Sequence, residues 1–540
     1  MRINSLNKSN DDFLGVGGSS RVFATGAAIL KPEDKFYTKM GIPSYFRRII
    51  EKYSGILKKD APKATYLCFD FNCLIYRCIR APGMPKSEET EEFETMLLRE
   101  VCKTVKEVWR AAGKPKNVLL AVDGVVPMAK IRQQRVRRFK SAWLRGNSSS
   151  WDTNSITPGT KFMDRLSVEL KKILGNGWVL SGVDEAGEGE QKIMEWIKKR
   201  CIGESIIIYG LDGDLILLSM IASSDKKISL MREKQEFGGG ISEPLPGEEQ
   251  QYTFMDIEEF KIRVGVCAED VMNYVGLMTL MGNDFLPHSL TQKLNDDGHD
   301  CVIREFKKMK KTGEWLIVDG KIQRGVLGRI CKTWALDEDD RILHTFEKKR
   351  KQAERGIMKG MDVSEGLPLE WNVERVMMNG GKLIDGWREE YWAFIHPFSD
   401  RDRLCAEYVY GCQWVIDYYV QKSVNKSWIF PAWIPPLWSD LGRWLSCENM
   451  KEVEPAIEPE PTPSEQLAMV LPLKSWGLVS KEYSILPILA PQMWPQEFTF
   501  FSLGRRWLWE CEARIPILTA GRVREILRGR RVDGEHVQHS

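Results

Sequence analysis

Short apolar segments that alternate with amphipathic stretches constrain the fold of this 540-residue chain more than any other feature. Between residues 40 and 287, four segments have the length and the β-branched content of buried strands. They are residues 65–69, 117–122, 205–209 and 227–231. Strands that alternate with helices in this way predict an open α/β sheet.

Acidic residues gather at one end of the expected strands. Four of them directly follow a strand, two begin a helix in the string GEGEQK, and one follows an apolar helical run in the string MGNDF. In an open α/β sheet, ligands bind in the crevice outside the carboxyl ends of the strands. A single acid at such a place is more often a helix cap or a turn residue, so the inference depends on the set. The set is Asp70, Asp123, Glu188, Glu190, Asp212, Asp214 and Asp284.

Carboxylates that converge in one crevice repel one another and raise each other's pKa unless cations are present. Oxygen ligands favour Mg²⁺ or Mn²⁺ over zinc or copper. Two such ions about 3.5–4 Å apart can activate a water and stabilise the leaving oxygen of a phosphodiester. We therefore expect phosphodiester hydrolysis with two Mg²⁺ ions, for which Mn²⁺ can substitute.

A basic segment follows the second strand-end acid. Residues 130–145 contain seven Lys or Arg and no acid. Lys130, Gln134, Arg137 and Arg138 have the spacing of one helical face, on which a solvated helix normally mixes charges of both signs. The face predicts a site for a phosphate group. A basic helix that binds no ligand is the alternative.

Composition excludes several classes of protein. No run of about 18 apolar residues appears, so no membrane span is expected, and the polar amino terminus argues against secretion. The 12 cysteines, which include no CxxC pair, are expected to be free thiols in the cytoplasm or nucleus, with the cytoplasm preferred. The segment Lys348–Lys351 is interpreted as a solvated charged face, with a nuclear address as the alternative.

Composition shifts divide the chain into five parts. We expect a disordered extension (1–39), an α/β domain (40–293), a charged helical linker region (294–366), a second region (367–516) and a basic tail (517–540) that is frayed over residues 521–540. The second region carries a Glu/Pro-rich flexible loop at 450–464 and an aromatic string, SWIFPAWIPPLWSDL. Its tryptophans fit either core packing or base stacking.

Ten strings in the chain resemble the Xrn-type 5′→3′ exoribonucleases, in the order in which that family has them. The resemblance covers residues 40 to 516 and includes both the α/β domain and the second region. The strings are MGIPSYFRRI, FDFN, AVDGVVPMAKIRQQRVRRF, NSITPGTKFM, GEGEQKIM, YGLDGDLILLS, GNDFLPH, QWVIDYYV, SWIFPAWIPPLWSDL and EQLAMVLP.

The resemblance implies a core related to PIN and flap nucleases, with a largely helical second region that walls off the active site. It implies that the seven acids bind metal, and that Lys130, Gln134, Arg137 and Arg138 read a 5′-monophosphate in a pocket too closed for a cap or triphosphate. It also implies that the terminal base stacks between Tyr76, where the family has His, and Trp428. The substrate would be single-stranded RNA, and the product nucleoside 5′-monophosphates.

Two other readings remain open. A structure-specific flap DNA nuclease shares the strand-end acids, and a non-catalytic RNA-binding scaffold could be built on the same fold. The resemblance ends near residue 516, so we expect a compact, core-only monomer without the long carboxyl-terminal domains of the family's large cytoplasmic form. We expect a protein partner to replace those domains.

Overall fold

The computed structural model describes most of the chain. The described residues are 42, 45–53, 55–81, 83–85, 90–146, 151–201, 203–210, 212–234, 250–358, 373–395, 400–448 and 450–529. The expected extension, residues 1–39, lies outside these ranges, as does the end of the expected basic tail.

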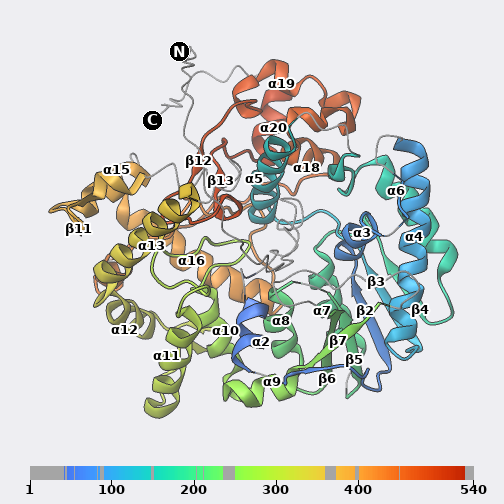
Figure 1. Ribbon diagram of the computed structural model, residues 1–540, viewed down its shortest axis with the longest axis horizontal. Coiled ribbons are helices and arrows are strands. Elements are labelled where there is room, and N and C mark those ends of the chain that lie inside the picture. Colours follow the sequence, from blue (N-terminus) through green and yellow to red (C-terminus); the bar gives the residue numbers. More distant parts are fainter. Residues whose placement is uncertain are drawn as a thin grey trace, which may run out of the picture.

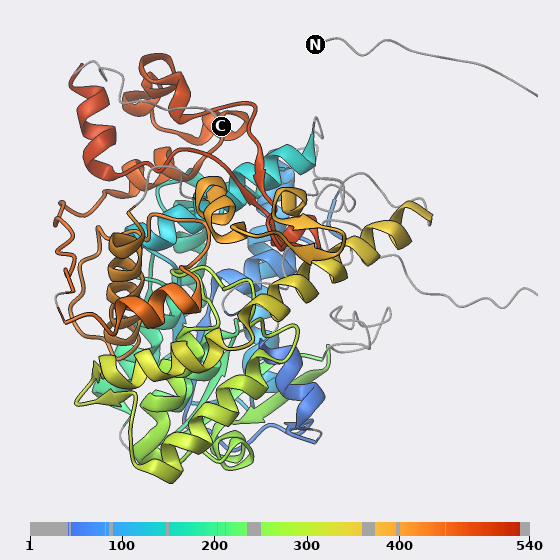
Figure 2. The same cartoon turned by 90° about the vertical axis from the view of Figure 1, so that its left-hand side faces the viewer.

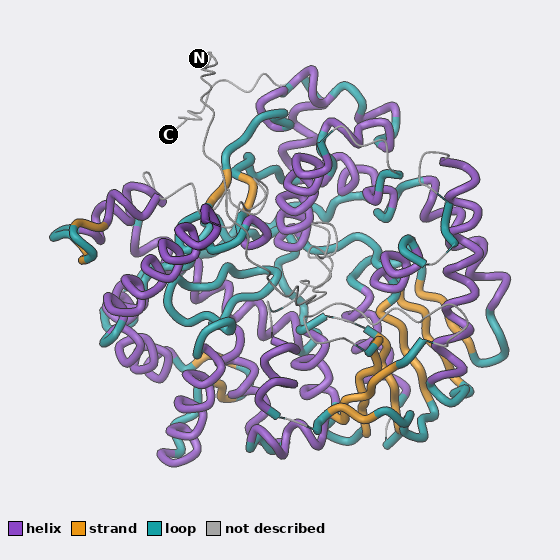
Figure 3. The backbone as a smooth tube through the Cα atoms, viewed as in Figure 1, coloured by secondary structure: helices purple, strands orange, loops and turns teal. Residues whose placement is uncertain are grey.

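A seven-stranded sheet forms the centre of the amino-terminal half and appears as the group of orange strands at the lower right of Figure 3. In spatial order the strands are β1 (Leu57–Lys58), β7 (Tyr252–Asp256), β6 (Lys227–Glu233), β5 (Ser205–Tyr209), β2 (Tyr66–Asp70), β3 (Asn117–Ala121) and β4 (Trp178–Ser181). The last five of these strands are parallel to one another, whereas β7 is antiparallel to both β6 and β1. The α/β sheet predicted from the sequence is therefore confirmed, and it is mostly parallel.

Helices cover both faces of this sheet, because successive residues of a strand point to opposite sides. In β2, Cys68 packs into one apolar core, while Leu67 and Phe69 pack into the other. The first core contains α2 (Tyr45–Lys52), α7 (Gly189–Arg200), α8 (Asp214–Ala222), α9 (Ile257–Val264) and α10 (Val271–Thr279). The second contains α3 (Asn72–Cys78), α4 (Thr90–Ala111) and α6 (Lys161–Ile173).

Later helices extend the first core rather than form a core of their own. Buried residues of each join the cluster that covers the sheet. These helices are α11 (Gly298–Thr312), α12 (Arg324–Ala335), α13 (Glu338–Met358), α15 (Trp387–Ile395), α16 (Arg401–Tyr419) and α17 (Trp438–Trp444). Short antiparallel pairs lie among them, β8 (Ile317–Val318) with β9 (Lys321–Ile322) and β10 (Met378–Asn379) with β11 (Lys382–Leu383). The expected linker, where described, is thus part of the packed structure.

The long helix α5 (Met128–Arg145) leaves the carboxyl edge of the sheet and runs into the second region (Figures 1 and 2). Its apolar side chains form a third core with α18 (Pro463–Val470), α19 (Leu486–Leu489) and α20 (Ala520–Leu527). The buried Lys140 amine donates to the carbonyl of Cys511, 2.6 Å away, just before the pair β12 (Phe500–Phe501) and β13 (Glu512–Ala513). One helix therefore links the site edge of the sheet to the second region.

Two expected flexible segments are held in place. The Glu/Pro tract has no helix or strand before α18, as expected of a loop, but Asn425 donates to the carbonyls of Pro455 and Ala456, each at 3.1 Å. The tail was expected to be frayed from residue 521, and this is wrong for residues 521–527. They belong to α20, whose Val523 and Ile526 are buried in the third core.

The basic run at Lys348–Lys351 is not uniformly solvated. Lys349 is 2% exposed, and its amine lies 2.8 Å from the Glu374 carboxylate and 2.9 Å from the carbonyl of Ser502. The expectation of a solvated face is therefore wrong at Lys349, because α13 packs this side chain inward. Lys351 is exposed on the same helix.

Removing the Lys349 amine leaves the buried Glu374 carboxylate without a positive partner. Lys349→Met is therefore expected to lower the free energy of unfolding by about 3–5 kcal/mol. The exposed neighbour provides the control, and Lys351→Met should change the free energy by less than about 0.5 kcal/mol. Chemical denaturation of both variants checks this. Equal stability of the two would mean that the Glu374 pair does not stabilise the fold.

None of the helices in the described part of the chain combines the length and hydrophobicity that a membrane span requires. All 12 cysteines are free thiols, as predicted.

Candidate active site

The carboxyl ends of the central strands carry the predicted acids. Asp70 is the last residue of β2, and it is paired in register with Ala121, the last residue of β3. Asp123 follows two residues later. Asp212 and Asp214 follow β5, the other parallel neighbour of β2, and Asp214 begins α8. These acids therefore share one edge of the sheet.

The remaining acids approach the same edge from helix ends. Glu188 is the N-cap residue of α7, and Glu190 lies in its first turn. A carboxylate is favourable at this end of a helix because the peptide dipoles leave partial positive charge there. Asp284 lies in the turn that follows α10. Its carboxylate is close enough to Asp212 and Asp214 to raise the pKa of both.

Burial dominates the protonation of the acids. It raises the pKa of Asp70, Glu190 and Asp214 well above the ordinary range, and neighbouring carboxylates raise these pKa values further. Burial also raises the pKa of Asp212 to about 7, although Lys130 opposes the shift. Like charges held together at this depth are costly unless a cation lies among them.

Lys130 supplies one such positive charge. Its amine lies 2.6 Å from the Asp284 carboxylate and also contacts the Glu188 carboxylate. Burial opposes the charged amine, but these carboxylates and Glu190 raise the pKa of Lys130 well above its ordinary value. The sequence predicted Lys130 as a phosphate ligand, whereas here it is the counter-ion of the acids.

Hydrogen-bond donors outside the predicted set fix the carboxylates. The Asn72 amide and the backbone N–H of Gly189 donate to the two oxygens of Asp123, at 2.8 and 2.7 Å. The Tyr418 hydroxyl donates to Glu188 at 2.9 Å. Sequence reasoning missed Asn72 and Tyr418, although they lie in the strings FDFN and QWVIDYYV. Tyr418 comes from α16, so the second region contributes directly to the site.

The donor set is made of carboxylate oxygens, which suits a hard divalent cation. In the described part of the chain, no three carboxylate, imidazole or thiol groups are close enough together to hold one metal ion. Glu188 and Asp284 are instead drawn onto the Lys130 amine. The residues thus fit a cation in charge and donor type, and a metal would compete with this ammonium group.

The predicted phosphate ligands lie on α5 but not on one open face. Gln134 and Arg138 are buried, and Arg138 donates to the Thr157 hydroxyl at 2.5 Å. Burial lowers the pKa of Arg138 to about 10. The Gln134 carbonyl oxygen has no hydrogen-bond partner among the described residues. Arg137 is more exposed and borders a cavity on another side of α5.

The two predicted stacking residues differ in exposure. Tyr76 lies on α3, is partly buried, and is close enough to Arg138 to influence its pKa. Trp428 is only 2% exposed, and its indole N–H donates to Glu407 at 3.1 Å. Its ring packs 5.5 Å from that of Trp414. Stacking of a base on Trp428 would require this ring to be uncovered.

Two family models match the chain. The model for the "XRN 5'-3' exonuclease N-terminus" matches residues 40–234, and the model for the "Xrn1 helical domain" matches residues 382–532. The first match contains every strand of the seven-stranded sheet except β7, and the second contains the helices α18, α19 and α20 that pack against α5.

Similar proteins include the 5'-3' exoribonuclease 1 of Homo sapiens, 25% identical over 90% of this chain, and that of Saccharomyces cerevisiae, 22% identical over 90%. A 5'-3' exoribonuclease 2 of Cryptococcus neoformans is 26% identical over 58% of the chain. The matches cover 34%, 43% and 37% of these three relatives, respectively. The chain thus spans less than half of the length of the curated relatives that it matches.

Proposed function

Because the chain belongs to the Xrn family of 5′→3′ exonucleases, we propose that it hydrolyses single-stranded RNA from a 5′-monophosphate end and releases nucleoside 5′-monophosphates. The observation that carries the proposal is the group of buried carboxylates at the carboxyl edge of the sheet, with the cationic helix α5 beside it. Buried carboxylates repel one another, and divalent cations remove this repulsion and also bind the phosphodiester that is cleaved.

We infer that the cations are divalent, with two Mg²⁺ ions as the simplest case. The residues that would hold them are Asp70, Asp123, Glu188, Glu190, Asp212, Asp214 and Asp284. When bound, such ions stabilise charge on the phosphodiester oxygens and lower the pKa of a water. Asn72 and the N–H of Gly189 orient the Asp123 carboxylate, and Tyr418 orients Glu188.

The basic side chains of α5 bind the terminal phosphate of the RNA rather than the scissile phosphodiester. Arg137 and Arg138 offer planar donors that suit the oxygens of a terminal phosphate, and the unpartnered oxygen of Gln134 can accept from a protonated group nearby. Burial makes this part of α5 selective, because each extra phosphate would add charge in a confined space. Tyr76 is the available aromatic neighbour for the first base.

The test uses one RNA, labelled at its 3′ end, with a 5′-monophosphate, a 5′-hydroxyl or a 5′-triphosphate, in Mg²⁺ and in EDTA. We expect degradation of the monophosphate form alone, dependent on metal, with mononucleotides released. The variant Arg138→Gln should reduce the preference for the monophosphate form more than tenfold. Equal degradation of all three RNAs would contradict the proposed phosphate pocket. Preferential cleavage of a flapped DNA would favour a flap nuclease instead. If no substrate were cleaved, the remaining hypothesis would be a non-catalytic RNA-binding scaffold.

A further inference from the structure

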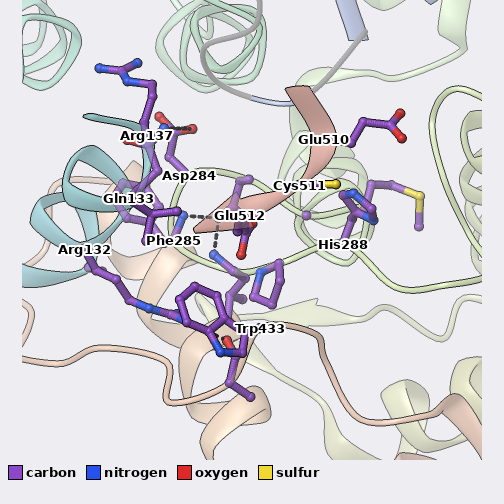
Figure 4. Close-up of a pocket in the computed structure, with 18 of the residues that line it drawn as sticks. Arg132, Gln133, Arg137, Asp284, Phe285, His288, Trp433, Glu510, Cys511 and Glu512 are labelled. Carbon is purple, nitrogen blue, oxygen red and sulfur yellow. Dashed lines mark hydrogen bonds between the residues drawn. The ribbon is translucent and has the colours of Figure 1, made fainter. Parts of the chain in front are cut away.

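A cavity lies beside the acids, on the side of α5 that carries Arg132 and Arg137 (Figure 4). Its volume is about 210 Å³. A single water needs about 10–15 Å³ by the same measure, so the cavity has room for a ligand rather than for one or two waters. Figure 4 shows Arg137 and Asp284 at one end, Trp433 at the other and Glu512 between them. The cavity therefore reaches one acid of the proposed active site, Asp284.

Cations line this cavity more densely than its acids require. Its basic residues are Arg132, Arg137, Lys140 and Lys293, and its acids are Asp284, Glu510 and Glu512. Of these acids, Asp284 already pairs with Lys130, which does not line the cavity. Lys140 and Lys293 are both buried, and burial lowers their pKa to about 8 and about 7. An anion in the cavity would recover the free energy that these buried charges cost.

Trp433 gives the cavity an aromatic wall. The indole is half-buried, and the Arg132 guanidinium lies 4.7 Å from its ring centre. Arg132 is itself fixed, because it donates to the carbonyls of Phe430 and Ala432 at 2.7 and 3.0 Å. The ring is therefore held in a defined orientation at the edge of the cavity, as a surface that stacks a base must be.

Polar groups without partners complete the lining. Among the described residues, the Gln133 carbonyl oxygen and the Asn283 amide nitrogen have no hydrogen-bond partner. The Glu512 carboxylate also lines the cavity. These atoms offer both acceptors and a donor. An inorganic phosphate would neither accept a contact from the indole face nor donate a hydrogen bond to Glu512. An apolar ligand would leave the cations without a negative partner. A molecule with an anionic end, hydroxyl groups and an aromatic base satisfies all of them.

We propose that this cavity binds a nucleoside 5′-monophosphate, with its base on Trp433, its ribose hydroxyls near Glu512 and its phosphate beside Lys140 and Lys293. The nucleotide is the product released at the neighbouring carboxylates, so the source of the ligand rests on the proposed function. Binding itself does not depend on catalysis. A nucleotide bound in this cavity slows product release from the active site, and the product therefore inhibits RNA degradation.

Calorimetric titration of the full chain in EDTA tests the proposal with adenosine 5′-monophosphate, adenosine and inorganic phosphate as probes. We expect adenosine 5′-monophosphate to bind more tightly than either fragment. Loss of one stacked base is expected to weaken binding about tenfold or more, so Trp433→Ala should weaken nucleotide binding by this factor and leave phosphate binding unchanged. Trp433→Phe, which keeps an aromatic face, should retain most of the affinity.

Trp476→Ala serves as the matched control, because Trp476 is a partly buried tryptophan that packs against the third core, away from the cavity. Glu512→Gln gives a second variant that does not depend on the indole and should weaken the nucleotide but not phosphate. Nucleotide binding that Arg138→Gln abolishes and Trp433→Ala does not would place the ligand in the phosphate pocket and overturn the proposal. Absence of nucleotide binding in a protein that degrades RNA would overturn the proposal alone, whereas binding without RNA degradation would overturn the proposed function alone.

Discussion

Asp212→Asn is expected to slow the degradation of 5′-monophosphate RNA by about 10³-fold. The substitution keeps the size of the side chain but removes a charge from the carboxylate group that would hold the cations. Loss of about 4 kcal/mol of transition-state stabilisation, the several kcal/mol that a metal site supplies, corresponds to this factor. Single-turnover degradation in saturating Mg²⁺ measures the change in the chemical step.

Stability should move in the opposite direction from activity in this variant. Burial raises the pKa of Asp212 to about 7, so its charged form is disfavoured in the folded protein. Replacing it with a neutral amide is therefore expected to preserve or raise the melting temperature in EDTA at pH 8. Asp164→Asn is the control, because Asp164 is an exposed acid on α6. If both variants degraded RNA at the rate of the unaltered protein, Asp212 would have no catalytic role.

The central strands could be predicted because burial on both faces makes them uniformly apolar. β5 was expected at its observed bounds, and β2, β3 and β6 differ from their expected bounds by one or two residues. β4 was missed because it is a four-residue edge strand, mostly not buried, and its three apolar residues form a run too short to indicate a strand by periodicity. The antiparallel β7 was missed as well, since YTFMD mixes polar and apolar residues.

The position of the acids followed from the strand ends, but their partners did not. Helical spacing places Lys130 on one face with Gln134 and Arg138. Spacing cannot show that Asp284, which lies in a turn far away in the sequence, forms an ion pair with the Lys130 amine. The burial of Trp428 likewise depends on α16, where Gly411 lies so close to the indole that a Cβ there would be 2.5 Å from a ring carbon. Contacts of this kind join segments far apart in sequence, and local patterns carry no record of them.

Lys130→Met is expected to lower the free energy of unfolding in EDTA by about 3–5 kcal/mol, because it leaves Glu188 and Asp284 without their buried counter-ion. Mg²⁺ should then restore much of the loss, since a cation that binds only the folded protein stabilises it by mass action. The measurement is the melting temperature as a function of Mg²⁺ concentration, at a pH high enough to keep the carboxylates ionised. The gain from Mg²⁺ should be larger in this variant than in the unaltered protein.

Lys349→Met separates this effect from the loss of any buried lysine. Lys349 also pairs with a buried glutamate, but it lies on α13, and the pair is formed with Glu374 rather than with the acids at the sheet edge. Both variants should melt earlier in EDTA, and only Lys130→Met should recover in Mg²⁺. If Mg²⁺ stabilised the two variants equally, the carboxylates around Lys130 would not be the place where the ion binds. A recovery confined to Lys130→Met would mean that the lysine and the metal compete for the same carboxylates, and that the ammonium group holds these acids together in the absence of metal.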